Sequence, residues 1–224
     1  MFVRATRGLD WLSRIAATIN DVTLWGWAER PARRLVFASD VPKLPRPLPR
    51  ALAPDVDRAV MAAVDGLDDP FARAGLTLLR RAGLRLGECL DLELDCVVDY
   101  GATGSWLRVP LGKLSTERMV PLEPTNVELL DTWAGGRGRK RPQPQPRTGL
   151  PTDFLFAERG HRLGPWRLRS ALRAAMIDAG LTGPGGEPPR VTPHQLRHTY
   201  ATELANVGLS LQGLMALLGH VAPR

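Results

Sequence analysis

Residues 192–202 of the chain read TPHQLRHTYAT. A threonine followed by a proline is typical of the first turn of a helix, so the stretch predicts that a helix begins here. His194 and Arg197 are three positions apart and would share one face of that helix. The free amide groups and the positive dipole end of a helix N-terminus favour phosphate. The stretch therefore predicts an anion site that contains an imidazole and a guanidinium.

Helical spacing of apolar residues recurs on both sides of this stretch. We expect helices over residues 54–64, 71–82, 84–92, 125–133, 166–179, 192–207 and 210–218. Short strand-like runs at 97–98, 106–109 and 118–122 are separated by glycines and predict a small antiparallel sheet. The expected fold class is mainly α with a small antiparallel β-sheet (α+β).

The chain divides into three expected parts. Residues 1–40 form a short helical piece rich in tryptophan, and residues 41–53 form a linker in which closely spaced prolines exclude a helix. Residues 54–224 form the main domain, which opens with Pro54 in the first turn of its first helix.

Composition indicates a globular protein with a polyanionic partner. The net charge is +7 and the pI is about 10.4. Only three of the 30 basic residues are lysines. Arginine suits bidentate contact with phosphate, although the same composition is typical of an arginine-rich genome. Two cysteines without a secretory leader, Cys89 and Cys96, predict buried free thiols, and no stretch is apolar enough to span a membrane. We therefore expect a cytoplasmic protein.

A basic stretch lies between residues 135 and 151 and contains no acidic residue. It predicts a mobile loop that contacts DNA, and the alternative of a solvated linker remains open. The candidate DNA-binding residues are Arg137, Arg139, Lys140 and Arg141.

Four motifs in order along the chain resemble those of the tyrosine recombinase, or phage integrase, family. The first is residues 83–90, GLRLGECL, and the second is Gly112-Lys113 followed by residues 117–122, ERMVPL. The third is residues 192–202, and the fourth is residues 217–220, LLGH. Their joint order makes the resemblance specific, and it covers most of the chain.

The resemblance implies a site-specific recombinase that cleaves and rejoins double-stranded DNA through a phosphotyrosyl intermediate. It implies catalytic roles for Arg85, Lys113, His194, Arg197 and His220, with Glu88 as a supporting carboxylate. Two guanidiniums would stabilise the charge that develops on the phosphate, and the lysine would act as general acid. The expected partners are DNA and further copies of the chain, and no cofactor is implied.

The family's nucleophilic tyrosine would follow the fourth motif. The tyrosines of this chain are Tyr100, in an expected turn, and Tyr200, which we expect in the core. The sequence is also short before residue 54 relative to the family. We therefore expect a fragment or a shortened relative that does not cleave DNA on its own, unless another protomer supplies the tyrosine.

Three other functions are compatible with parts of the pattern. A catalytically inactive DNA-binding relative would need only the basic charge. A zinc enzyme could use His194, His198 and His220, but Gln195 stands where such helical motifs carry a glutamate base. A helical interaction scaffold would not explain why the five candidate residues match the motifs in order.

Overall fold

The structure is a computed structural model that describes residues 50–110, 117–138, 141–183, 186–187 and 189–219. All of them belong to one compact unit, Pro49–Arg224. The expected N-terminal piece 1–40, and most of the expected linker 41–53, lie outside the described residues.

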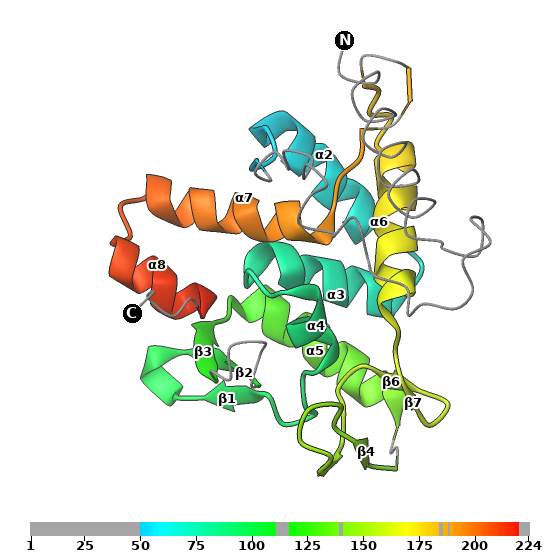
Figure 1. Cartoon of the computed structure of the whole chain (residues 1–224), viewed down its shortest axis with the longest axis vertical. Helices are drawn as coiled ribbons and strands as arrows, with labels where there is room; N and C mark the ends of the chain where they lie inside the picture. The colour runs from blue at the N-terminus through cyan, green and yellow to red at the C-terminus, as the bar shows by residue number, and fades with distance from the viewer. Residues whose placement is uncertain (1–49, 111–116, 139–140, 184–185, 188, 220–224) are drawn as a thin grey trace, which may run out of the picture. The chain divides into compact units, whose positions relative to one another are not determined.

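Seven helices of four or more residues are described (Figure 1). They are α2 (Pro54–Asp65), α3 (Pro70–Arg81), α4 (Leu86–Leu90), α5 (Pro124–Arg137), α6 (Pro165–Asp178), α7 (Pro193–Asn206) and α8 (Leu211–Leu218). The described strands are β1 (Val97–Asp99), β2 (Ser105–Val109), β3 (Arg118–Pro121), β4 (Gln143–Pro144), β5 (Pro151–Thr152), β6 (Ala157–Glu158) and β7 (His161–Arg162). The expected fold class is confirmed.

Helix α3 is the central element of the domain. Asp69 caps its first turn by accepting hydrogen bonds from the amides of Phe71 and Ala72, at 3.1 and 3.3 Å. Most of the helix is buried, and it packs against α2, α5, α6 and α7. The ring of Phe71 contacts those of Trp133 and Phe156, with centroids 5.9 and 5.1 Å apart.

Strands β1, β2 and β3 form the predicted antiparallel sheet, in that order. Leu107 lies opposite Val97 on one side and Val120 on the other. The side chains of all three face the core. The alternation along the strand turns the side chain of Arg118, two positions before Val120, toward the interior. The sheet therefore carries a buried arginine at the start of its last strand.

The loop predicted over residues 135–151 begins later than expected, because α5 continues past two glycines to Arg137. The Arg137 guanidinium donates to the carbonyl oxygens of Phe154 and Leu155, at 2.6 and 3.1 Å, and pairs with Asp153. Its side chain is 1% exposed. This burial argues against the expected contact between Arg137 and DNA and makes the residue part of the core.

The part of the basic stretch that follows residue 140 contains a pair of short strands rather than an irregular loop. Strands β4 and β5 form a two-residue antiparallel pair around a tight turn, in which the Gln145 side chain accepts from the amides of Arg147 and Thr148. Arg141 and Arg147 are exposed. Arg139 and Lys140 lie outside the described residues.

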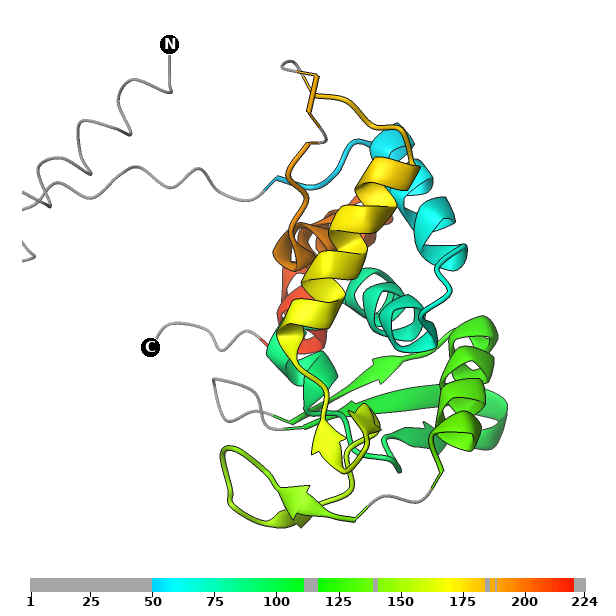
Figure 2. The same ribbon diagram turned by 90° about the vertical axis from the view of Figure 1, so that its right-hand side faces the viewer.

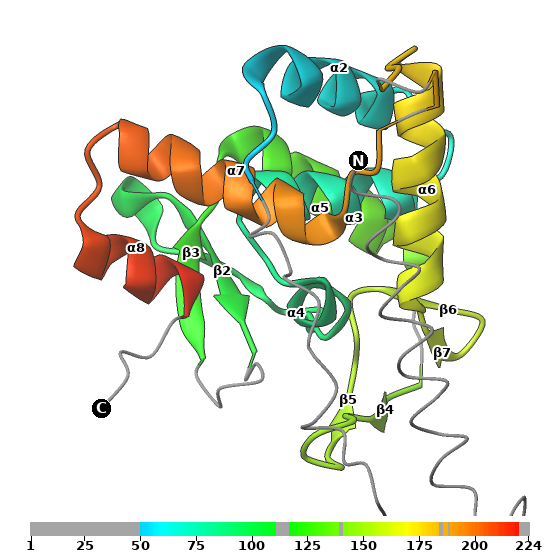
Figure 3. The ribbon, with the colours of Figure 1, turned by 45° about the horizontal axis from the view of Figure 1, so that its top comes forward.

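Helices α7 and α8 bring distant segments together. Helix α7 packs along α3, and α8 packs against α7 and β3, as Figure 3 shows. Figure 2 shows α6 running across the domain beside α3 and above β6 and β7. As a result, the segment before α4, the start of α7, the end of α8 and the start of β3 meet in one region.

Two expectations about composition can be compared with the structure. Cys89 and Cys96 are free and buried, as predicted, and burial raises the pKa of the Cys96 thiol to about 12. Among the described residues, every helix is too short or too polar to cross a membrane.

Candidate phosphate site

Helix α7 begins at Pro193, one residue after the start of the predicted range 192–207, and Thr192 is its N-cap. The Thr192 hydroxyl accepts from the Gln195 amide at 3.3 Å, and the Gln195 side chain accepts from the Thr192 amide at 3.0 Å. This reciprocal cap and Pro193 in the first turn position the two candidate residues that follow. His194 is exposed, whereas Arg197 points into the protein and is buried.

Arg197 is anchored to the main chain of two distant segments. Its Nη1 and Nη2 donate to the carbonyl oxygens of Gly83 and Leu218, each at 2.5 Å. Burial, followed by the charge of nearby Arg85, lowers the pKa of Arg197 to about 10. The guanidinium therefore remains charged at neutral pH and holds the first and fourth motifs against the third.

Gly83 lies against the ring of Tyr200, where there is no room for a side chain. Its φ is +60°, and a Cβ at this position would lie 2.3 Å from a ring carbon of Tyr200. Tyr200 is buried, which confirms the prediction that it packs in the core. The ring of Tyr200 and the backbone of Gly83 thus pack too closely for any residue other than glycine.

Arg85 and Glu88 form the second half of the site. The Glu88 carboxylate accepts from the Arg85 amide at 2.8 Å and from Arg85 Nη1 at 2.6 Å. The first contact caps α4, and the second directs the guanidinium. The Arg85 side chain is 27% exposed, while that of Glu88 is 3% exposed. The supporting role expected for Glu88 therefore has a geometric basis.

Glu88 is surrounded by positive charge. Arg85, Arg118 and Arg197 all have guanidinium nitrogens within 4 Å of its carboxylate, the last at 3.6 Å. Burial would raise the pKa of Glu88, but the hydrogen bonds and charge of Arg118, and then of Arg85, outweigh it and lower the pKa to about 2. One negative and three positive charges give this cluster, the Glu88 cluster, a net charge of +2.

The contact between Arg118 and Glu88 was not predicted from the sequence. Arg118 falls within the second motif, and the alternation of side chains along β3, which places residues 118 and 120 on the same side, could have indicated that it is buried. A buried arginine needs an acidic partner, and this partner is 30 residues away in sequence. Only the folded chain reveals that the partner is Glu88.

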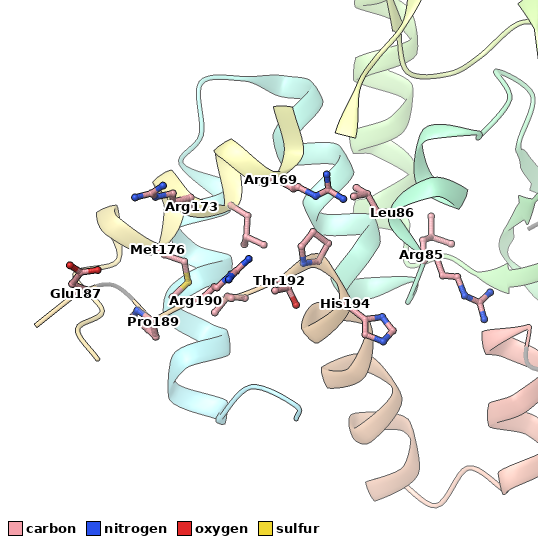
Figure 4. Close-up of a pocket in the computed structure, with 14 residues that line it drawn as sticks. Arg85, Leu86, Arg169, Arg173, Met176, Glu187, Pro189, Arg190, Thr192 and His194 are labelled. Atoms are coloured by element: carbon pink, nitrogen blue, oxygen red, sulfur yellow. The ribbon is translucent and has the colours of Figure 1, made fainter. Parts of the chain in front are cut away.

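A cavity of about 780 Å³ adjoins the cluster (Figure 4). Arg85 and His194 lie at one end of it in this view, and Arg173 lies toward the other. Arg169 and Arg190 also line it, and its apolar lining includes Leu84, Leu172, Met176 and Val191. These three further arginines were not among the predicted site residues, although the spacing of four between 169 and 173 places both on one face of α6.

His194 also contacts His198 on the next turn. Their Nε2 atoms are 3.1 Å apart and their rings meet edge to face. Burial, and then the charge of Arg197, lowers the pKa of His198. Within the described part of the chain, no group of three or more His, Cys, Asp or Glu side chains is arranged to hold a metal ion.

The expected convergence of five residues can be followed for three of them. Arg85 and Arg197 meet at Glu88, and His194 lines the same cavity as Arg85. Lys113 and His220 lie outside the described residues. The arrangement of the described residues suits the binding of an anion such as a phosphate.

The chain is similar in sequence and in fold to known recombinases. Tyrosine recombinase XerC of Myxococcus xanthus is 32% identical over 184 residues, which cover 80% of this chain and 57% of that protein. The crystal structure of XerA recombinase superposes with a TM-score of 0.57 at 25% identity and covers 78% of this chain and 57% of that one. XerH bound to a difH substrate in a pre-cleavage complex shares the fold, with a TM-score of 0.62 at 21% identity, over 88% of this chain and 53% of that one.

The chain spans a little over half the length of these relatives. Residues 50–224, which include the whole Glu88 cluster and the cavity beside it, match the Phage integrase family. The four motifs, the arrangement of Arg85, Glu88 and Arg197, and this match lead to one conclusion: the chain belongs to the Phage integrase family.

Proposed function

We propose that this chain carries the phosphate-binding part of a site-specific DNA recombinase, which cleaves and rejoins DNA strands through a phosphotyrosyl intermediate. The observation that carries the proposal is the Glu88 cluster, in which Arg85 is hydrogen-bonded to the carboxylate and Arg197 lies 3.6 Å from it, beside the exposed His194. Two relatives are named as tyrosine recombinases or recombinases, which supports the same activity here.

The cluster offers a partly exposed guanidinium over a buried one. Arg85, at 27% exposure, can donate directly to a non-bridging phosphate oxygen. Arg197 is 4% exposed and contributes its charge from beneath, with its position set by two carbonyl groups. A phosphodiester gains negative charge at its non-bridging oxygens as a nucleophile attacks, so a fixed net charge of +2 stabilises that state more than the ground state.

Other roles in the proposal depend on the resemblance. Lys113 would protonate the leaving deoxyribose oxygen, and His194 and His220 would complete the hydrogen bonds around the phosphate. Duplex DNA would be the partner, and copies of the chain would associate on it, within the cytoplasm and at the nucleoid. The net charge of +7 and the exposed Arg141 support a DNA partner.

The proposal is tested by measuring how the affinity for duplex DNA varies with salt concentration. Removing one phosphate contact should reduce the slope of log K against log salt by about 0.9. We expect this reduction in Arg85→Ala. Arg58→Ala, which removes an exposed guanidinium from α2, is the matched control and should retain the parent slope. Equal slopes in the parent and Arg85→Ala would refute the proposed phosphate site.

A second assay separates a recombinase from a DNA-binding relative that does not cleave. The chain is incubated with a nicked duplex and examined for a protein–DNA adduct that survives denaturation. We expect no adduct from the chain alone, because Tyr200 is buried and no motif points to Tyr100. An adduct that disappears in Tyr100→Phe and in Arg85→Ala would overturn this expectation and identify the nucleophile.

A further inference from the structure

Arg118 joins three of the segments that form the candidate site. Its Nη1 and Nη2 donate to the two oxygens of Glu88, at 3.1 and 2.8 Å, and its Nε donates to the carbonyl oxygen of Leu217 at 2.6 Å. Its side chain is 6% exposed. One guanidinium therefore links α4, β3 and the end of α8.

The contact with α8 is close as well as polar. Gly219 has a φ of +60°, and a Cβ there would lie 3.1 Å from Arg118 Nη1. The backbone at the end of α8 thus packs directly on the guanidinium.

Arg118 also determines how much charge remains for a phosphate. Glu88 has one negative charge, which Arg118 neutralises through a bidentate contact. Arg85 and Arg197 then keep their positive charges for an anion outside the protein. Without Arg118, the carboxylate would draw on Arg85 and Arg197, and the net charge of the cluster would fall from +2 to +1.

We propose that Arg118 is a positioning residue for the phosphate site: it holds Glu88 and the end of α8 together and neutralises the carboxylate so that Arg85 and Arg197 remain available. This inference rests on the proposed function. A lysine could not replace it, because a single ammonium cannot reach both carboxylate oxygens and the Leu217 carbonyl with the geometry of a planar fork.

The test uses the full chain, duplex DNA and the salt series described above. In Arg118→Met we expect affinity to fall about tenfold at 0.1 M salt and the slope to fall by about 0.9, although Arg118 is too buried to contact DNA. Arg108→Met is the matched control. It removes a guanidinium from the same sheet that pairs with Asp95 at 2.8 Å, and it should retain the parent slope.

A double variant separates positioning from simple structural support. Arg118→Met combined with Glu88→Gln removes one charge of each sign, so the net charge returns to +2, while the glutamine side-chain oxygen can still accept from the Arg85 amide and guanidinium. We expect the slope to return toward the parent value in the double variant, whereas a purely structural role would leave it as low as in Arg118→Met. If Arg118→Met alone does not fold, the double variant and the parent still provide the comparison, because the double variant buries no unpaired carboxylate.

The outcomes distinguish this inference from the proposed function. A reduced slope in Arg85→Ala together with a parent slope in Arg118→Met would refute the role proposed for Arg118 but not the phosphate site. A slope that stays low in the double variant would also refute it. Parent slopes in both Arg85→Ala and Arg118→Met would refute the phosphate site itself.

Discussion

Replacing Gly83 with alanine tests how closely the first and third motifs pack. Two costs arise. A non-glycine residue in the left-handed region costs about 1–2 kcal/mol, and Gly83 has a φ of +60°. The new Cβ would also lie 2.3 Å from the buried ring of Tyr200, and overpacking of this kind costs about 1–3 kcal/mol. We therefore expect the free energy of unfolding to fall by about 2–5 kcal/mol.

Gly101 provides a control with the same backbone conformation. Its φ is +61°, and a Cβ there would meet no heavy atom within 4 Å. Gly101→Ala should therefore cost only the conformational part, about 1–2 kcal/mol. Urea unfolding followed by circular dichroism measures both variants, and Tyr200→Leu should relieve part of the loss caused by Gly83→Ala. Equal losses in Gly83→Ala and Gly101→Ala would show that the packing argument is wrong.

Two further predictions concern buried charges. The pKa of Glu88 is about 2 in the folded chain against 4.5 ordinarily, so its contribution of about 3 kcal/mol is present above pH 4.5 and is lost as the pH falls toward 2. Urea midpoints between pH 6 and pH 3 should therefore fall more steeply for the parent than for Glu88→Gln, and equal pH dependence would contradict this. Arg137→Met leaves two carbonyls without their charged donor and should cost about 3 kcal/mol, against less than about 0.5 for the exposed Arg147→Met. A DNA salt slope reduced in Arg137→Met but not in Arg147→Met would contradict the structural role of Arg137.

Local signals were sufficient to predict where most helices begin. Proline at the first turn located α2, and Thr192 followed by proline located α7, where the structure contains the threonine side-chain cap. Each of these signals acts over three or four residues, so a linear sequence contains all of it. The three strands of the sheet were likewise predicted from short strand-like runs separated by glycines.

The extent of α5 and the partners of the buried arginines depend on distant residues. Two consecutive glycines predict the end of a helix, yet α5 continues because Arg137 finds acceptors at residues 153–155. Arg118 is similar, since its partners Glu88 and Leu217 are 30 and 99 residues away. A charged side chain does not indicate in the sequence whether it will face solvent or a buried carboxylate.

The two anchors of Arg197 are peptide oxygens rather than side chains. Every amino acid supplies such an oxygen, so replacing the side chain of Leu218 would leave its hydrogen bond chemically intact. The side chains around Arg197 can therefore vary, because the path of the backbone sets the orientation of its guanidinium. Mutational scans should accordingly find position 197 intolerant and its partner at 218 sensitive mainly to changes in size.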